Sequence, residues 1–419
     1  MMRPGTMPLR FAYSSGTLGL NQVERGEIRA SFSGIGRTPV IVQAMPAIDA
    51  SGSEATALWA AEVAALAGAE SIVASGSGPA ERLKRFGAKH LMVAIEQSGP
   101  LASSGNITRL RKLILETKAD ILHVRSQEIA WAALQAARDT QCIVVTSCGT
   151  DDVFSNVTRD GGSLAEGHCI IAGSNHVKEL IQQSDAERGE RIAVIPDGAD
   201  LANYCPESVS AERLAQLAKS WGNLEEPSPI ILVPGAVGPL RGQIDLVRAL
   251  GVILRTTTKA ADATLIIAGA IGRTDSYARE LSRVVKNLGL QKRVFIAGEL
   301  YDMPAAMLMA DVVASVPTRP LGQDSIAAMA AALGKPVIGA SHGATAETVE
   351  ENNTGRLCFP SNPDAIASAI TDILLLPAFL RNQMAENARA RAEKLFSARK
   401  SALALARVYG ALLGSNGLR

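Results

Sequence analysis

The stretch ADVVASVPTRPLGQDSIAAMAAALGKPVIGAS, residues 310–341, decides the fold. Its β-branched run at 312–313 predicts a strand, the Pro/Gly segment after it predicts a loop, and the small residues that follow Asp324 predict a helix. The run 336–338 predicts the next strand. The free N–H groups and positive dipole end of such a helix form a natural seat for phosphate. An ordinary strand–helix–strand unit with a tight helix–sheet contact explains the same residues.

The rest of the chain alternates between the same two patterns. Short continuous apolar runs alternate with segments of helical periodicity, as in 121–124, 129–137 and 142–146. Such alternation predicts an α/β fold with doubly wound parallel sheets. The length of 419 residues allows two domains, each long enough to bury its own core.

Composition excludes several function classes. Lys plus Arg number 42 against 41 Asp plus Glu, so no global field attracts nucleic acid or an anionic membrane. The five cysteines are an odd number without CxxC spacing, which predicts reduced thiols and no disulfide, zinc or other metal site. No apolar run reaches the roughly 18 residues of a membrane helix, and the first 20 residues lack the apolar core of a secretory signal. We therefore expect a cytoplasmic protein without a transmembrane segment.

Three motifs carry a resemblance to a known family. Val194-Ile195-Pro196-x-Gly198, Gly334-x-Pro336-Val337 and Glu347-Thr348-Val349 are similar to motifs of glycosyltransferase family 4, the retaining group that includes glycogen synthases and mannosyltransferases. The resemblance runs through nearly the whole chain from Pro39. It implies a GT-B fold, in which two Rossmann-like doubly wound domains face an interlobe cleft. It also implies a nucleotide-sugar donor, a glycan or lipid-linked acceptor, no further cofactor, and possible peripheral contact with the inner face of the membrane.

The resemblance also divides the chain. Residues 1–36 are expected to form an irregular extension, 37–205 the acceptor-side domain, 206–229 a linker, and 230–394 the donor-side domain. A helix predicted within the linker covers 211–221. The last segment, 395–419, reads as a helix that packs back on the first domain and continues without a break from the residues before it.

The family's chemistry is missing at several positions. When the chain is anchored on Gly334-Lys335-Pro336-Val337, the two glutamates of the family fall at Leu321 and Met329. The histidine that reaches the transferred sugar falls at Cys148, and an arginine that binds phosphate falls at Ala236. Cysteine donates only a weak hydrogen bond, and Leu and Met cannot replace a carboxylate as acceptor.

Other positions keep residues that suit a donor site. Arg241 stands where the family has a cation that contacts the donor, although an ordinary solvated loop charge explains it equally. Arg241, Arg273 and Arg319 could converge on a phosphate. Gln323 or Ser325 could replace a hydroxyl contact, whereas Asp324 would cap its helix and repel an anion. Gly52 fits either a binding turn or a plain helix start with Ser53 as N-cap. The positions predicted to contact the donor are Gly52, Gly235, Arg241, Arg273, Arg319, Ser325, Gly343 and Glu347.

These departures lead to three functional hypotheses. The first is a glycosyltransferase-like protein with a degenerate donor site that acts as a partner or scaffold in polysaccharide or glycolipid assembly, beside an active glycosyltransferase. The second is a divergent but active retaining enzyme. The third is a module that binds nucleotide sugar without turnover.

His123, on an apolar run, reads as a packed strand residue.

Overall fold

The computed structural model describes residues 18, 20–46, 52–77, 83–95, 102–125, 127–149, 164–184, 186–221, 228–256, 262–271 and 276–415. The described chain divides into two compact units. The N-terminal unit runs up to Pro196 and resumes at Ala398, and the C-terminal unit is Asp197–Ser397. The divisions at 196/197 and 397/398 differ from the domain boundaries expected at 205/206 and 394/395.

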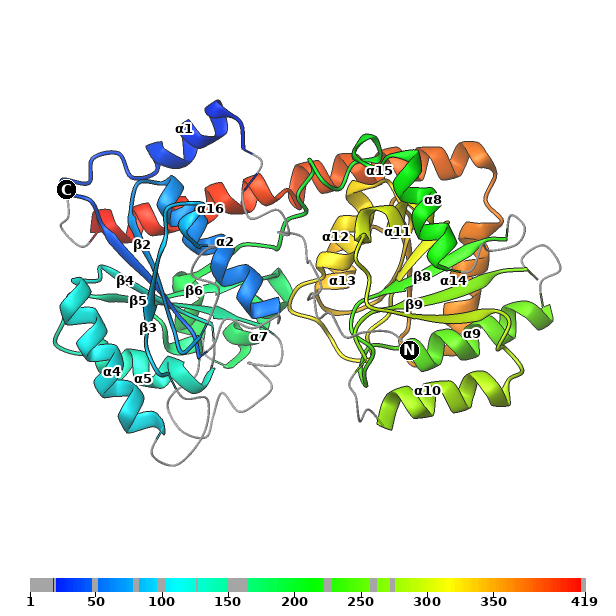
Figure 1. Ribbon diagram of the computed structural model, residues 1–419, viewed down its shortest axis with the longest axis horizontal. Coiled ribbons are helices and arrows are strands. Elements are labelled where there is room, and N and C mark those ends of the chain that lie inside the picture. Colours follow the sequence, from blue (N-terminus) through cyan, green and yellow to red (C-terminus); the bar gives the residue numbers. More distant parts are fainter. Residues whose placement is uncertain are drawn as a thin grey trace. The chain divides into compact units, whose positions relative to one another are not determined.

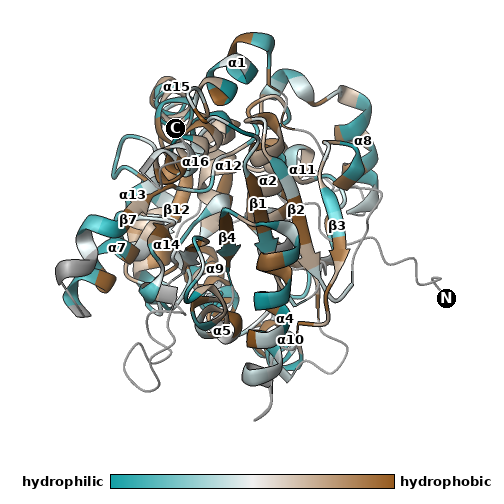
Figure 2. Ribbon diagram, turned by 90° about the vertical axis from the view of Figure 1, so that its left-hand side faces the viewer, coloured by the Kyte–Doolittle hydropathy of each residue, from teal (hydrophilic) through white to brown (hydrophobic). Residues whose placement is uncertain are grey.

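The N-terminal unit, drawn mainly in blue and cyan in Figure 1, contains a parallel sheet. This sheet has seven strands in the order β3-β2-β1-β4-β5-β6-β7. The central strands β1 and β4 are buried throughout and mostly apolar, and largely brown in Figure 2, because both faces of the sheet are covered. The edge strand β3 is only partly buried. The strands are β1 Val40–Ala44, β2 Glu70–Ser75, β3 Lys89–Met92, β4 Ile121–Val124, β5 Ile143–Cys148, β6 Cys169–Ala172 and β7 Ile192–Val194.

Helices cover both faces of this sheet. On one face lie α4 (Ala102–Thr117), α5 (Gln127–Ala137) and α7 (Asn175–Ser184). On the other lie α2 (Gly52–Leu66) and the last helix, α16 (Ala398–Ser415), with α1 (Gln22–Ala30) packed against both. The short 3₁₀ helices η1 (Leu164–Glu166) and η2 (Ala186–Arg191) connect the later strands.

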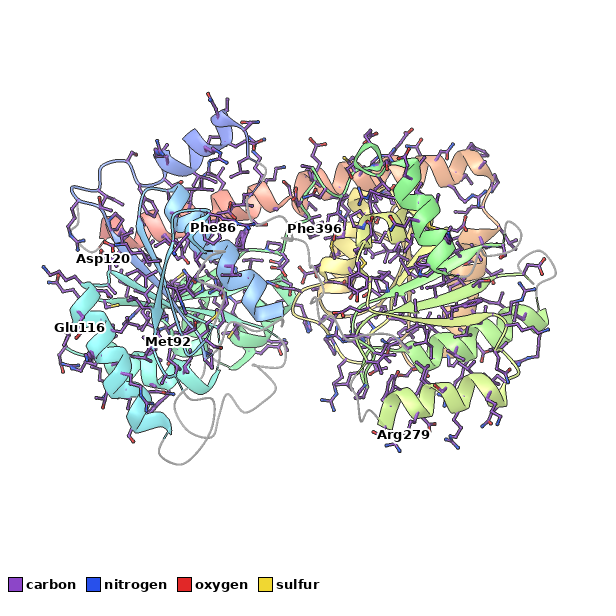
Figure 3. The ribbon with its side chains drawn as sticks, in the orientation of Figure 1. Phe86, Met92, Glu116, Asp120, Arg279 and Phe396 are labelled. Atoms are coloured by element: carbon purple, nitrogen blue, oxygen red, sulfur yellow. The ribbon has the colours of Figure 1, made fainter. Side chains whose placement is uncertain are left out.

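The sheet is pinned at its amino edge by Asp120, which is labelled in Figure 3. Its carboxylate accepts hydrogen bonds from the Arg37 guanidinium and, at 2.8 Å, from the backbone N–H of Val40. The acid before β4 therefore holds the start of β1, the neighbouring strand.

The C-terminal unit contains a six-stranded parallel sheet in the order β10-β9-β8-β11-β12-β13. On one face lie α9 (Gln243–Thr256), α10 (Ser276–Asn287) and α14 (Pro363–Leu374). The other elements are α8 (Ala211–Ser220), α11 (Met303–Met309), α12 (Ser325–Ala332), α13 (Gly343–Thr348), α15 (Ala378–Leu395) and η3 (Pro206–Ser208). The strands are β8 Ile230–Pro234, β9 Thr264–Ala268, β10 Val294–Gly298, β11 Val312–Ser315, β12 Val337–Ala340 and β13 Gly355–Cys358.

Two terminal predictions are wrong. Residues 22–30, within the predicted irregular extension, form α1, because Asn21 and Glu24 make a reciprocal capping box and Ile28 is buried. The helix predicted to run unbroken into the tail ends at Leu395, since Phe396 and Ser397 leave the helix and Ser397 forms a parallel bridge with Ala199.

The structure also differs from the predictions for the linker and for the start of α2. The helix α8 forms where expected, but it belongs to the C-terminal unit, since Arg213 on α8 makes a two-pronged ion pair with Asp302 at 2.7 Å. Residues 206–221 are therefore not a free connection. Because α2 already begins at Gly52, Ser53 lies inside the helix and not at its N-cap.

Candidate functional site

The candidate site lies at the carboxyl edge of the C-terminal sheet, where β8 and β11 are neighbours. Strand order reverses there, since β9 and β10 lie on one side of β8 and β12 and β13 lie beyond β11. Open α/β sheets bind ligands at such a switch point. The loops 235–242 and 316–324 meet at it, because the N–H of Thr318 donates to the carbonyl of Leu240 at 3.0 Å.

Two predicted glycines shape these loops. Gly235, directly after β8, has φ +112°, a conformation that side chains rarely adopt. Gly343, which starts α13, has φ +62°, and a Cβ there would lie 2.7 Å from the backbone nitrogen of Leu321. The loop that carries Leu321 therefore packs directly on the first turn of α13, where Ala344 N–H also donates to the Leu321 carbonyl at 2.9 Å.

The carboxylate of Asp324 accepts hydrogen bonds from three elements of the site. It is the N-cap of α12, and its Oδ1 accepts from the N–H of Ala327 at 3.0 Å. Its Oδ2 accepts from the hydroxyl of Ser315, at the end of β11, at 2.8 Å and from that of Thr345, on α13, at 2.6 Å. The carboxyl group is buried and joins three elements, so the start of α12 is closed by the protein's own acid.

Burial raises the pKa of Asp324 above its ordinary value. The hydrogen bonds from Thr345, Ala327 and Ser315 and the charge of Arg241 act in the opposite direction without reversing the shift. An anion at this helix end would lie beside a carboxyl group that already takes up the N–H of Ala327.

Leu321 and Met329 occupy different environments. Met329 is 1% exposed on a helix whose residues 327–332 are all buried, so its thioether is a packing group. Leu321 is half-buried in the loop. Neither side chain offers a carboxylate acceptor to a ligand hydroxyl, since leucine has no acceptor and the methionine thioether is a weak one.

Two of the three predicted arginines lie on these two loops. Arg241 and Arg319 directly follow Leu240 and Thr318, which are hydrogen-bonded to each other, and both arginines are exposed. Ser325, the first residue of α12, is half-buried. Arg273 lies outside the described residues.

Gln323 is occupied within its own unit. With its amide nitrogen facing the acid, its side chain donates to both carboxylate oxygens of Asp197 at 3.0 and 2.5 Å. The prediction that Gln323 replaces a hydroxyl contact would require this pairing to break.

Glu347 is half-buried on α13. Arg391 of α15 donates to the carbonyl of Glu347 at 2.8 Å and to that of Thr348 at 3.0 Å. Because these carbonyls end the helix, the guanidinium is a favourable partner for its negative pole. The backbone that carries Glu347 is thus held from α15.

The corresponding edge of the N-terminal sheet carries a different buried network. His123 is fully buried, and its Nδ1 lies 2.6 Å from the Tyr409 hydroxyl and its Nε2 2.9 Å from that of Ser147. Gln43 donates to the same Tyr409 oxygen at 3.1 Å, and Arg125 donates to Gln43 at 2.6 Å. Burial, aided by the charge of Arg125, lowers the pKa of His123 well below its ordinary value.

This network has a structural role. It joins β1, β4 and β5 to α16, which agrees with the prediction that His123 is a packed strand residue. Cys148 ends β5 and is buried, and Gly52 is the first residue of α2.

Sequence reasoning missed the partners of both networks. Ser315 and Thr345 lie 9 and 21 residues from Asp324, and Tyr409 lies 286 residues from His123. A polar residue on an otherwise apolar strand was the available signal for His123. No local sequence pattern links Ser315 or Thr345 to Asp324, or Tyr409 to His123.

The described residues contain no group of three or more His, Cys, Asp or Glu side chains that could hold a metal ion. Within the same ranges no single helix is long and apolar enough to cross a membrane, although α14 and α15, bent by 106°, pass that test of length and composition together.

Two family models match consecutive parts of the chain. The model described as Glycosyltransferase Family 4 matches residues 51–203, and the model described as Glycosyl transferases group 1 matches residues 218–391.

Curated relatives with similar sequences carry glycosyltransferase names. A D-inositol 3-phosphate glycosyltransferase of Salinispora tropica is 29% identical over 59% of this chain and 52% of its own length. A putative glycosyltransferase of Bacillus subtilis, YtcC, is 29% identical over 70% of this chain and 73% of its own. This chain thus spans about half of the first relative.

Solved structures share the fold. A glycosyltransferase from Rickettsia africae superposes with a TM-score of 0.78 at 22% identity, covering 91% of this chain and 99% of that one. Anabaena HepE in complex with UDP superposes with a TM-score of 0.73 at 20% identity, covering 89% and 100%. At these identities the likeness establishes the GT-B fold alone.

Proposed function

We propose, from the premise that the chain belongs to glycosyltransferase family 4, that it is a member with a degenerate donor site that acts as a partner or scaffold in polysaccharide or glycolipid assembly. The hypothesis concerns the loops at the switch point of the C-terminal sheet. Its expected associates are a glycan or lipid-linked acceptor and an active glycosyltransferase.

The single observation that carries the proposal is the closed start of α12. A helix N-terminus binds phosphate through free N–H groups and its dipole. Here Asp324 takes up the Ala327 N–H and is held by two hydroxyls, so a diphosphate would meet an acid instead of an open helix end. An N-cap of this kind supports the helix by about 1 kcal/mol, which is a structural role.

The lost contacts set the expected affinity. A hydrogen bond to a charged group contributes roughly 1.5 to 3 kcal/mol, so the absence of both glutamates at Leu321 and Met329 removes about 3 to 6 kcal/mol. At about 1.4 kcal/mol per factor of ten, donor affinity falls by roughly a hundredfold to ten-thousandfold.

A divergent active enzyme is the second candidate. It is favoured by the exposed Arg241 and Arg319 on adjacent loops, which suit a diphosphate. Anabaena HepE has been solved with UDP and with UDP-glucose, which makes uridine nucleotides the first donors to test. A module that binds nucleotide sugar without turnover would use the same arginines.

Calorimetric titration of the full chain with uridine, guanosine and adenosine diphosphate sugars separates these functions. The scaffold proposal predicts no saturable binding at about 1 mM donor, which corresponds to a binding free energy weaker than about −4 kcal/mol. Micromolar binding with donor hydrolysis would establish the enzyme, and micromolar binding alone would establish the module.

A further inference from the structure

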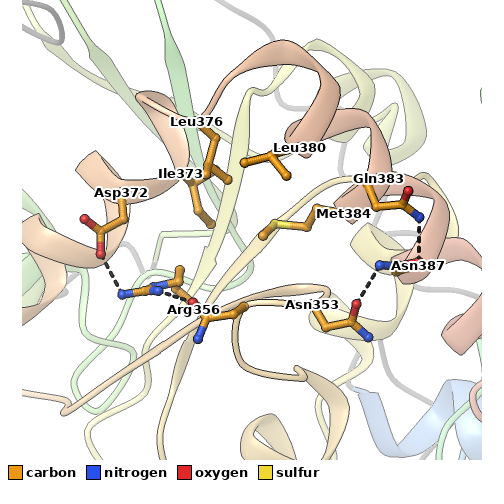
Figure 4. A pocket seen from close by; sticks show the side chains of 10 residues that line it. Asn353, Arg356, Asp372, Ile373, Leu376, Leu380, Gln383, Met384 and Asn387 are labelled. Carbon is orange, nitrogen blue, oxygen red and sulfur yellow. Dashed lines mark hydrogen bonds and ion pairs between the residues drawn. The ribbon is translucent and has the colours of Figure 1, made fainter.

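A cavity of about 240 Å³ lies at the amino edge of the C-terminal sheet (Figure 4). It is enclosed by the loop before β13, the end of α14 and the first turns of α15. All strands of a parallel sheet start at one edge and end at the other. The cavity therefore lies at the edge opposite the loops 235–242 and 316–324, and no functional residue predicted from the sequence lines it.

The floor of the cavity is apolar. Ile373 and Met384 are 1% and 5% exposed, and Leu376 and Leu380 complete the surface between them. Leu380 is 40% exposed, so it borders the opening. In Figure 4 these four side chains lie between two groups of polar side chains.

The first polar group is centred on Arg356. Its guanidinium donates to Asp372 Oδ2 at 2.6 Å and to Asn352 Oδ1, and its Nε lies 3.3 Å from a carboxylate oxygen of Glu351. One cation faces two acids, so this side is net negative and disfavours phosphate or carboxylate ligands. Asp372 Oδ1 takes no part in these bonds and remains an acceptor for a hydroxyl.

The second polar group is a row of amides. Gln383 donates to Asn387 at 3.2 Å, and Asn387 donates to Asn353 at 2.5 Å. A side-chain amide has two donor hydrogens and a carbonyl with two lone pairs. Asn353 also donates to a carboxylate oxygen of Glu350 at 3.0 Å. Each amide in the row still retains donor or acceptor capacity.

We propose that this cavity is a second binding site, for a single neutral pyranose sugar. A pyranose has apolar C–H faces and hydroxyls around its rim, so it can lie on Leu376, Leu380 and Met384 while its rim meets Asp372 on one side and Gln383 on the other. The volume lies just below the usual range of about 300 to 1,000 Å³ for ligand pockets, which suits one sugar residue. Sugar binding in this cavity does not depend on whether the loops 235–242 and 316–324 bind a nucleotide.

The test is calorimetric titration of the full chain with methyl α-D-glucopyranoside and methyl α-D-mannopyranoside, followed by maltotriose and α-mannotriose. We expect saturable millimolar binding of at least one monosaccharide, at about −4 kcal/mol or weaker. Equal or tighter binding of the matching trisaccharide identifies a glycan chain end as the natural ligand. Binding of the monosaccharide alone identifies a free sugar. No saturation of any probe by about 50 mM overturns the proposal.

A matched pair of variants locates the binding. Leu380→Trp fills the mouth of the cavity at a partly exposed position, and Leu375→Trp places the same side chain at a 45% exposed position that does not line it. We expect at least about tenfold weaker sugar binding in L380W and less than about twofold change in L375W, with thermal unfolding as a check on folding.

A third variant and a competition experiment with UDP further test where the sugar binds. Gln383→Ala removes one exposed amide and should weaken sugar binding about threefold to tenfold. UDP at saturating sugar should displace nothing, because the cavity lies at the other edge of the sheet. Displacement of the sugar by UDP, or unchanged binding in L380W, would assign the sugar to another site and overturn the proposal, without bearing on donor binding.

Discussion

The carboxyl edges of the two sheets each hold a buried polar network, and the two networks do opposite things. In the C-terminal unit an acid, Asp324, closes the start of α12. In the N-terminal unit a neutral histidine, His123, joins three strands to α16 through Tyr409. Burial raises the pKa of the acid and lowers that of the base, so both groups are pushed toward their neutral forms.

The comparison teaches that the edge where such folds bind ligands is here used for internal bonding in both units. Substitutions can break each network separately. The contributions of the two networks to the free energy of unfolding should also change in opposite directions as the pH rises.

The largest effect is expected for Asp324→Ala. It removes the cap of α12 and leaves the buried hydroxyls of Ser315 and Thr345 without their acceptor, which should lower the free energy of unfolding by about 3 kcal/mol. Urea denaturation measures the loss. The matched control, Asp324→Asn, keeps a capping oxygen and should retain most of the stability; an equal loss in both variants would show that the charge itself is required.

Tyr409→Phe should cost about 2 kcal/mol of unfolding free energy, because it leaves His123 and Gln43 without their shared buried partner. Tyr301→Phe is the control, since Tyr301 is 70% exposed. If the two variants were equally stable by urea denaturation, the network would not hold α16.

The pH dependence should separate the networks, by up to about 1.4 kcal/mol per pH unit for each titrating group. The raised pKa of Asp324 makes its contribution to stability greatest below its ordinary pKa of 3.8 and progressively lost as pH rises through the raised value. The lowered pKa of His123 makes its contribution complete above its ordinary pKa of 6.5 and lost as pH falls below that value.

Unfolding free energies measured across pH in Asp324→Asn and His123→Gln isolate these slopes from those of other groups, such as His168, whose pKa is also lowered by burial. Identical pH profiles of wild type and either variant would contradict the corresponding assignment.

The smallest effect is expected for Met329→Leu, a change that conserves volume in a well-packed site and should cost at most about 1 kcal/mol. Its titration with nucleotide sugars should match that of the wild type, because Met329 is a packing residue. A clear change in donor binding would show that the thioether faces the ligand.

Most strands could be predicted from the sequence, because parallel strands covered on both faces are continuous apolar runs such as 121–124 and 337–340. The cap at Asp324 was also predictable, since N-cap preference is local. The helix α1 was hidden by its Gly- and Arg-rich surroundings. Its capping box, Asn21 with Glu24, was the local signal.

Much of the candidate site could not be predicted, because its contacts are tertiary. The bond from Thr345 to Asp324 depends on how α13 packs beside α12, and the contact between Thr318 and Leu240 depends on the reversal of strand order. The cavity beside Met384 exists only because α14 and α15 meet at an angle, which no spacing of residues encodes.

Titration of the unmodified chain with UDP-glucose and GDP-mannose, followed by calorimetry and by assay of donor hydrolysis, tests the central claim most directly. The account predicts no saturable heat at about 1 mM of either donor and no hydrolysis above background. A micromolar dissociation constant that is lost when Arg241 and Arg319 are replaced by Ala would contradict it.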